Sequence, residues 1–206
     1  MPFVYSNQPH VRKHGPAGYS DYTTFKPWLR DEFRFRCVYC LERERWCLSG
    51  HADFGVDHVR PQGNPEFANL AYDYENLVYA CNRCNRAKRE RLLLDPCVNQ
   101  FAEHLQIADD GSIVGLTLEG QRLINCLGLA DAKLQSTRRR LLLILRFHET
   151  HPDDPDARAL YVDCFGYPDD LPDLDPLRPE KNSRPTGLTE TYFRQREEGR
   201  LPETYF

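Results

Sequence analysis

The sequence has no long hydrophobic run. Uninterrupted apolar stretches reach only about five residues, as in residues 141–145, whereas a membrane-spanning helix needs roughly 20. The first residues, MPFVYS, have neither the charged region nor the apolar region of a secretory signal. We therefore expect a cytoplasmic chain with no membrane span.

The chain also lacks a strong excess of either charge. It holds 27 Lys and Arg against 31 Asp and Glu, a net charge of -4. The acidity is concentrated after residue 148, where 14 acidic and 7 basic side chains occur, so that residues 1–148 are mildly basic. A mildly basic body is compatible with a polyanionic ligand but does not require one.

Disulfides are not expected, because nothing in the sequence indicates export and reduced thiols are the rule inside cells. Four of the eight cysteines nevertheless form two pairs of identical spacing, Cys37-x-x-Cys40 and Cys81-x-x-Cys84. Four thiolates close a tetrahedral site and leave no open position for a substrate. The spacing therefore predicts structural Zn²⁺, with buried free thiols as the alternative.

Composition divides the chain into four segments. With 206 residues, 40% hydrophobic, it suits one globular body with appendages. Residues 1–22 are rich in Pro and Gly and predict an irregular arm on the surface or on a partner. Residues 23–97 predict the zinc domain, 98–165 a helical cap, and 166–206 an extended acidic, Pro-rich tail in which Glu-Thr-Tyr-Phe occurs twice, at 190–193 and 203–206. These repeats could anchor a partner or pack back on the body.

Periodicity predicts the elements of the zinc domain and the cap. Apolar spacing indicates a helix over residues 23–35, capped by Thr23 or Thr24. Residues 54–59 and 76–80 predict two strands, and a basic helix is expected from about Cys84 to a point before Pro96. In the cap we expect helices over residues 118–127 and after Asp131, with the arginines at 138–140 mostly outside the apolar stripe.

The candidate site residues follow these elements in order. Asp57-His58 closes the first strand, Asn76 opens the second, and Cys84-Asn85-x-x-Lys88 starts the helix. Within a frame of two cysteine pairs, this order resembles the HNH endonuclease family over about residues 34–95. The resemblance implies an α+β fold: a treble-clef-like ββα-metal core with a structural zinc held by the four paired cysteines, flanked by N-terminal and C-terminal helices and an irregular tail.

The same resemblance implies hydrolysis of phosphodiester bonds in DNA. His58 would act as the general base, because a neutral imidazole can deprotonate water. Asp57 and Asn85 would hold a divalent cation that stabilises the leaving oxygen, and Asn76 would orient His58 through a backbone contact. Asn85 occupies the position of the third residue of the HNH motif, which is His in the family name. The oxygen ligands of Asp57 and Asn85 favour Mg²⁺ or Mn²⁺.

Three basic residues of the helix, Lys88, Arg86 and Arg89, are candidates for phosphate contacts, and solvated side chains are the alternative for each. Two other functions stay open at this stage. One is a zinc-stabilised nucleic-acid-binding module without catalysis, and the other is an effector that cleaves RNA.

A protein partner is also expected. A single ββα-metal core grips few phosphates, and the rest of the sequence offers no second nucleic-acid-binding motif, so target choice must come from elsewhere. HNH subunits are often encoded beside ATPases in bacterial anti-phage defence and restriction modules. The resemblance therefore implies a partner such as an ATPase that supplies target recognition.

Overall fold

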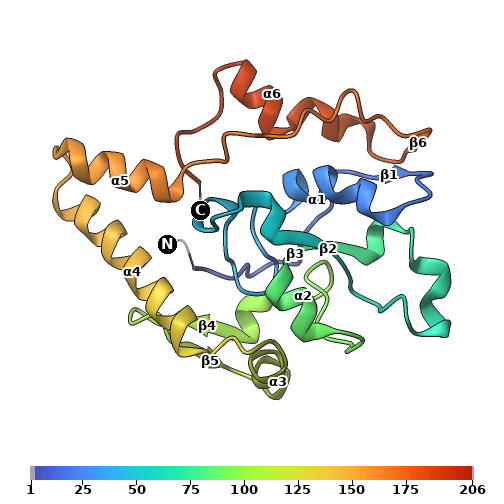
Figure 1. Ribbon diagram of the computed structural model, residues 1–206, viewed down its shortest axis with the longest axis horizontal. Helices are drawn as coiled ribbons and strands as arrows, with labels where there is room; N and C mark the ends of the chain where they lie inside the picture. The colour runs from blue at the N-terminus through green and yellow to red at the C-terminus, as the bar shows by residue number, and fades with distance from the viewer. Residues whose placement is uncertain (1–2, 206) are drawn as a thin grey trace.

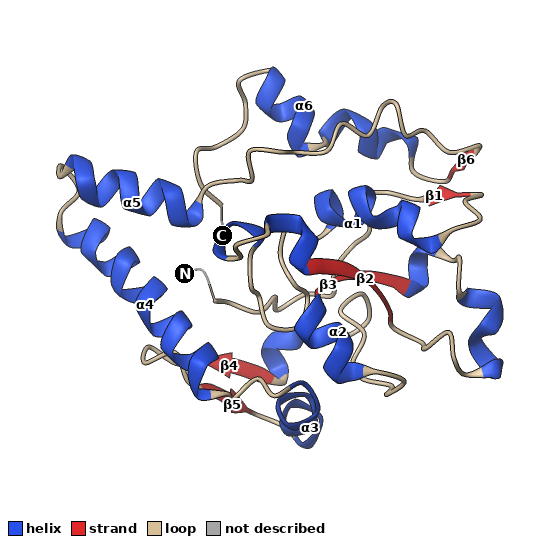
Figure 2. Ribbon diagram, in the orientation of Figure 1, coloured by secondary structure: helices blue, strands red, loops and turns tan. Residues whose placement is uncertain are grey.

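A two-stranded antiparallel sheet followed by a short helix lies at the centre of the molecule (Figures 1 and 2). The computed structural model describes residues 3–205. Strand β2 (Phe54–His58) pairs with β3 (Leu77–Cys81), and α2 (Asn82–Lys88) follows β3 directly. This ββα unit inside a mixed helix and sheet fold confirms the predicted fold class.

The expected basic helix is shorter than its composition indicated. It ends at Lys88 because Arg89 adopts a left-handed conformation, with φ of 52°, which a continuing α-helix cannot accommodate. The residues before Pro96 are irregular instead.

Helix α1 (Lys26–Glu32) packs against the central sheet and is preceded by a 3-10 turn, Tyr22–Phe25. The expected cap at Thr23 or Thr24 is wrong, because Asp21 accepts a hydrogen bond from the Thr23 N–H and so begins the turn. Further 3-10 turns occur at Glu44–Trp46, Gly50–Asp53, Pro65–Leu70, Tyr74–Asn76, Phe101–Glu103 and Pro185–Glu190.

The cap begins with a small hairpin, β4 (Leu105–Ile107) and β5 (Ile113–Gly115), and continues with three helices. These are α3 (Leu118–Leu127), which has the predicted bounds and ends at Gly128 with φ of 62°, α4 (Ala132–Thr150) and α5 (Pro155–Phe165). Helices α4 and α5 form a V at one side of the molecule (Figure 1). No helix within residues 3–205 is long and apolar enough to cross a membrane.

The sequence placed Arg138 outside the apolar stripe of α4, and the structure shows that this prediction is wrong. Arg138 is buried, and its guanidinium donates hydrogen bonds to the carbonyls of Gly111, at 2.7 Å, and Leu129, at 2.9 Å. The side chain therefore ties α4 to the turn of the hairpin and to the turn after α3.

The N-terminal arm is irregular, but it is not confined to the surface. Phe3 and Tyr5 belong to the main core, and Arg12 is buried with its guanidinium 5.0 Å from the centres of two aromatic rings. Arg12 also donates a hydrogen bond to the carbonyl of Leu77, at 2.6 Å. Strand β1 (Pro16–Ala17) pairs with β6 (Lys181–Asn182), so backbone hydrogen bonds connect the N-terminal arm to the C-terminal tail.

The tail folds back on the body and contains α6 (Tyr192–Glu197). The tyrosines of the two repeats meet the same partner: the Tyr205 ring lies 4.4 Å and the Tyr192 ring 5.3 Å from that of Tyr167. Phe35 completes this aromatic cluster. The arrangement favours packing over partner anchoring, while Phe206 lies outside the described residues.

Candidate active site and zinc centre

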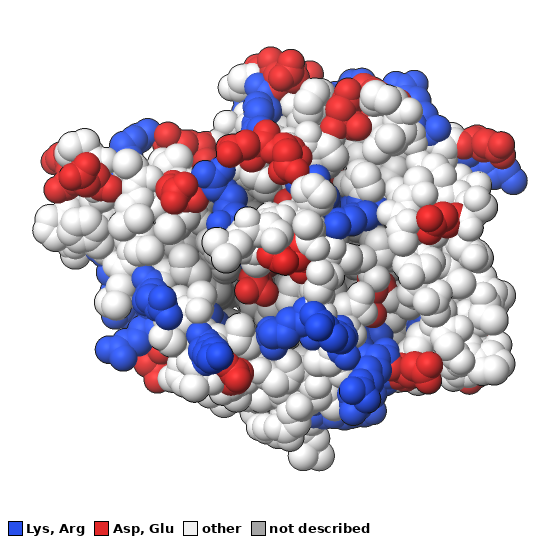
Figure 3. Space-filling view, in the orientation of Figure 1, with Lys and Arg blue, Asp and Glu red and all other residues white. Residues whose placement is uncertain are grey.

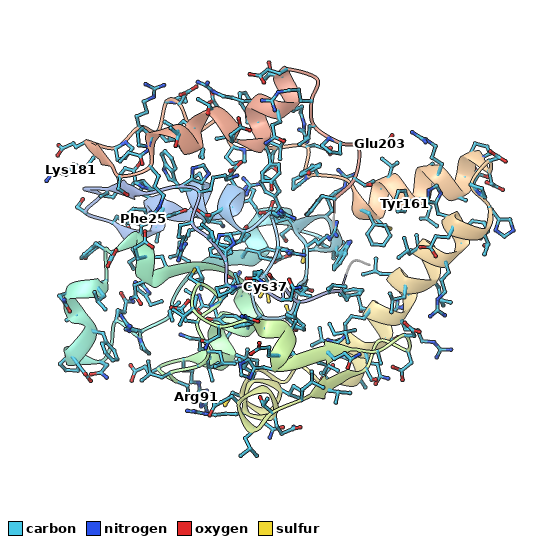
Figure 4. All side chains as sticks on the ribbon, turned by 180° about the vertical axis from the view of Figure 1, so that it is seen from behind. Phe25, Cys37, Arg91, Tyr161, Lys181 and Glu203 are labelled. Atoms are coloured by element: carbon cyan, nitrogen blue, oxygen red, sulfur yellow. The ribbon has the colours of Figure 1, made fainter. Side chains whose placement is uncertain are left out.

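The two cysteine pairs converge on one point. The sulfurs of Cys37, Cys40, Cys81 and Cys84 all lie within 4.8 Å of one another, and those of Cys40 and Cys81 are 3.7 Å apart. Tetrahedral Zn²⁺ lies about 2.3 Å from each sulfur, which separates the sulfurs by about 3.8 Å. Figure 4 shows the sulfur atoms gathered beside Cys37 at the centre of the molecule. The cluster is suited to structural zinc.

A zinc ion in the cysteine cluster would also link the elements that carry the candidate site residues. Cys81 is the last residue of β3 and Cys84 lies in α2, whereas Cys37 and Cys40 come from the loop after α1. Burial raises the pKa of the Cys37 thiol above its ordinary value of 9.0, so a cation is needed to hold it as a thiolate. The metal would thus join the first loop, the sheet and the helix.

His58, the expected general base, is the last residue of β2 and is held in one orientation. Its Nε2 lies 3.0 Å from the carbonyl oxygen of Ala71. A carbonyl can only accept, so Nε2 carries the proton and Nδ1 has the free electron pair. The Tyr22 ring packs edge-on against the imidazole at 4.8 Å. Burial lowers the pKa of His58 from 6.5, which keeps the imidazole neutral near pH 7 as a base requires.

Asn76 is buried and bridges the two ends of the loop that follows β2. Its Oδ1 accepts from the Arg60 N–H at 2.8 Å, and its Nδ2 donates to the carbonyls of Arg60, at 3.0 Å, and Leu70, at 3.2 Å. Leu70 directly precedes Ala71, whose carbonyl holds His58. Asn76 therefore holds the loop whose Ala71 carbonyl contacts the imidazole, and it does so through the backbone of Arg60 and Leu70.

Asp57 is buried, and each of its carboxylate oxygens already accepts a hydrogen bond. Oδ2 accepts from the Tyr39 hydroxyl at 2.7 Å, and Oδ1 from the Lys88 ammonium at 3.2 Å. Burial raises the pKa of Asp57, while Lys88 and Tyr39 oppose that rise. Each oxygen retains a further lone pair, so the carboxylate can still bind a cation.

Lys88 does not face solvent or a phosphate, contrary to the expectation from its basic neighbourhood. Only 1% of its side chain is exposed. Besides Asp57, its ammonium donates to the main-chain carbonyl of His58 at 2.5 Å. The reason is helical geometry: Lys88 lies one turn after Cys84, on the face of α2 that packs against the sheet. Arg86 and Arg89 are exposed and stay available for phosphate contacts.

Asn85 lies where α2 meets β2. Its Nδ2 donates to the carbonyl of Val56 at 3.1 Å, and none of the residues within 3–205 donates to its Oδ1. Asp57 and Asn85 thus offer a carboxylate and an amide oxygen, both hard ligands of the kind that Mg²⁺ or Mn²⁺ prefers. This donor set fits a divalent cation whose remaining ligands are water and phosphate.

Sequence reasoning missed two contributors to the site, the Tyr39 hydroxyl and the Ala71 carbonyl. Tyr39 lies between Cys37 and Cys40, so its placement beside the cysteine cluster could have been anticipated from the motif, although its hydrogen bond to Asp57 could not. No sequence signal marks Ala71, because the contact uses only its backbone.

Comparison with protein families supports the resemblance. Residues 37–91 match the family model of the HNH endonuclease, and this segment contains all four zinc cysteines and every candidate site residue. The matched segment is therefore similar to HNH domains, a family made up typically of nucleases. The match covers fewer than a third of the 206 residues. No curated protein matches the chain.

Proposed function

We propose that this chain is a metal-dependent endonuclease that hydrolyses phosphodiester bonds in DNA. The observation that carries the proposal is the state of His58. Its Nε2 is bound to the Ala71 carbonyl, burial keeps the ring neutral, and Nδ1 is left to accept a proton. Asp57 precedes His58 in β2 and interacts electrostatically with it, and Asn85 contacts the same strand through the Val56 carbonyl with its Oδ1 unengaged. A binding module without catalysis has no need of an imidazole arranged in this way.

The residues would divide the reaction between them. His58 Nδ1 takes a proton from a water, and the resulting hydroxide attacks the phosphorus while the bond to the leaving oxygen breaks. Mg²⁺ or Mn²⁺ held by Asp57 and Asn85 would stabilise the charge on that oxygen. Asn76 keeps the loop, and with it the base, in position.

The charge distribution supports approach of a polyanion from the side of α2. Figure 3 shows a row of Lys and Arg side chains over the lower part of this face, where Figure 1 places α2, and further ones among the acidic side chains of the upper part. Most Asp and Glu side chains lie over the upper half, near α5 and the tail. Exposed Arg86, Arg89 and Arg91 lie in α2 or directly after it, and such side chains attract phosphates.

Digestion of supercoiled plasmid tests the proposal. Zinc-loaded wild type is incubated in EDTA, Mg²⁺ or Mn²⁺ beside His58→Ala and, as a matched control, His151→Ala, which removes an exposed imidazole at the end of α4. We expect metal-dependent relaxation by wild type and His151→Ala, and none by His58→Ala. Equal cleavage by His58→Ala, or no cleavage by any of the three, contradicts the proposal.

We extend the proposal to a protein partner. The few phosphate contacts available to one HNH domain leave target choice to another subunit, and an ATPase of a bacterial defence or restriction system is the partner we propose from the family resemblance. A purified chain that recognises and cleaves its target at full rate on its own would remove the need for that subunit.

A further inference from the structure

A buried lysine lies beside the residues that would hold the divalent cation. The Lys88 ammonium is 3.2 Å from Asp57 Oδ1 and 2.5 Å from the carbonyl oxygen of His58. Its side chain is 1% exposed and that of Asp57 is 5% exposed, so water screens the pair weakly. Lys88 therefore joins the carboxylate of the metal site to the backbone of the base.

This ion pair changes the charge that a metal would meet. Asp57 is the negative member of the proposed ligand set, and Asn85 is neutral. Because Lys88 offsets the charge of Asp57, the two ligands and the lysine together carry no net charge. Divalent cations in proteins are ordinarily held by a surplus of carboxylates. The Lys88 ammonium would also repel a cation bound to Asp57, because like charges a few ångströms apart repel strongly where the dielectric is low. The protein alone is thus a poor cation site.

A nucleic-acid phosphate would supply the missing negative charge. It would add an anionic oxygen to a cation that Asp57 and Asn85 would hold, as in other sites where Mg²⁺ is bound through one or two carboxylates and substrate phosphates. We infer that Lys88 is a positioning residue that offsets Asp57, so that divalent cation and nucleic acid bind this site together and the free chain holds the cation only weakly. The inference rests on the proposed function.

The first test measures Mn²⁺ binding by electron paramagnetic resonance. Zinc-loaded His58→Ala protein, which is expected to leave DNA uncut, is titrated with Mn²⁺ in the absence and in the presence of a short DNA duplex. Titrations of the duplex without protein and of the Asp57→Asn variant give the background. We expect Mn²⁺ to bind at least about tenfold more tightly when the duplex is present. Equal affinity in both states overturns the inference.

The second test removes the lysine charge. Lys88→Met in the same His58→Ala background keeps an unbranched side chain and leaves Asp57 unpaired. We expect free protein to bind Mn²⁺ at least about tenfold more tightly. The matched control is Arg91→Met, which removes one exposed positive charge just beyond α2 and should leave the Mn²⁺ affinity within about twofold. Unchanged affinity in Lys88→Met overturns the inference.

Zinc content and circular dichroism show whether Lys88→Met folds; if it does not, the duplex comparison with Lys88 in place decides alone. Both tests read cation binding rather than cleavage. Failure of the inference therefore appears in the Mn²⁺ titrations, whereas failure of the proposed function appears as an uncut plasmid in the wild-type digestion.

Discussion

Replacing Asn76 with Ala should destabilise the protein and disable the site together. The amide makes three hydrogen bonds to the backbone of Arg60 and Leu70, and the residue is 5% exposed. A buried hydrogen bond contributes about 1 kcal/mol net, so we expect Asn76→Ala to lower the free energy of unfolding by about 3 kcal/mol. Plasmid cleavage should fall further than the unfolded fraction explains, because the Ala71 carbonyl loses its support.

Asn64 provides the control within the same loop. It caps a 3-10 turn through one hydrogen bond to the Glu66 N–H, at 3.1 Å, and does not bridge the ends of the loop. Asn64→Ala should cost about 1 kcal/mol. Urea unfolding followed by circular dichroism, with zinc and a reductant present, measures both variants. If Asn76→Ala costs no more than Asn64→Ala, the bridging role is refuted.

Three further predictions concern the frame around the site. Cys84→Ser should lose zinc and solubility, whereas His58→Ala keeps one zinc per chain by metal analysis, since zinc binding at such sites drives folding. Burial raises the pKa of Glu32, but an imidazole and two backbone N–H groups lower it to about 2. Above pH 4.5 the ionised Glu32 therefore adds up to about 3 kcal/mol to the free energy of unfolding, and this contribution is lost as the pH falls toward 2. In Glu32→Gln the free energy of unfolding should depend less on pH over that range. Tyr205→Ala removes a buried ring and should cost about 3 kcal/mol in urea unfolding, against less than about 0.5 for exposed Tyr72→Ala.

Local patterns were sufficient to predict the zinc cysteines and much of the secondary structure. The spacing of two residues between paired cysteines fixes a zinc-binding turn within one short segment, and Gly128 ends α3 where its backbone turns left-handed. The order Asp57, His58, Asn76 identified the segment that matches the HNH model. In each of these cases the determining residues are close in sequence.

Long-range packing could not be predicted in this way. Strand β1, Pro16–Ala17, pairs with β6, Lys181–Asn182, although most of the chain separates the two strands in sequence. Neither strand has an apolar pattern of its own. The predicted exposure of Lys88, which assumes that a lysine among arginines is usually solvated, is wrong. Its burial depends on Asp57, a charged partner about 30 residues away, which periodicity does not detect.

The docked tail has a consequence for how the protein folds during synthesis. The Arg43 guanidinium, in the loop after the first cysteine pair, lies 4.1 Å from the ring centroid of Tyr205. Domains fold on the ribosome as their residues emerge, at roughly 5–20 residues per second. The cysteines emerge early, but the side of the domain that Tyr205 covers stays open until residue 205 has left the ribosome. The segment that matches the HNH family therefore completes its packing only after almost the whole chain is made.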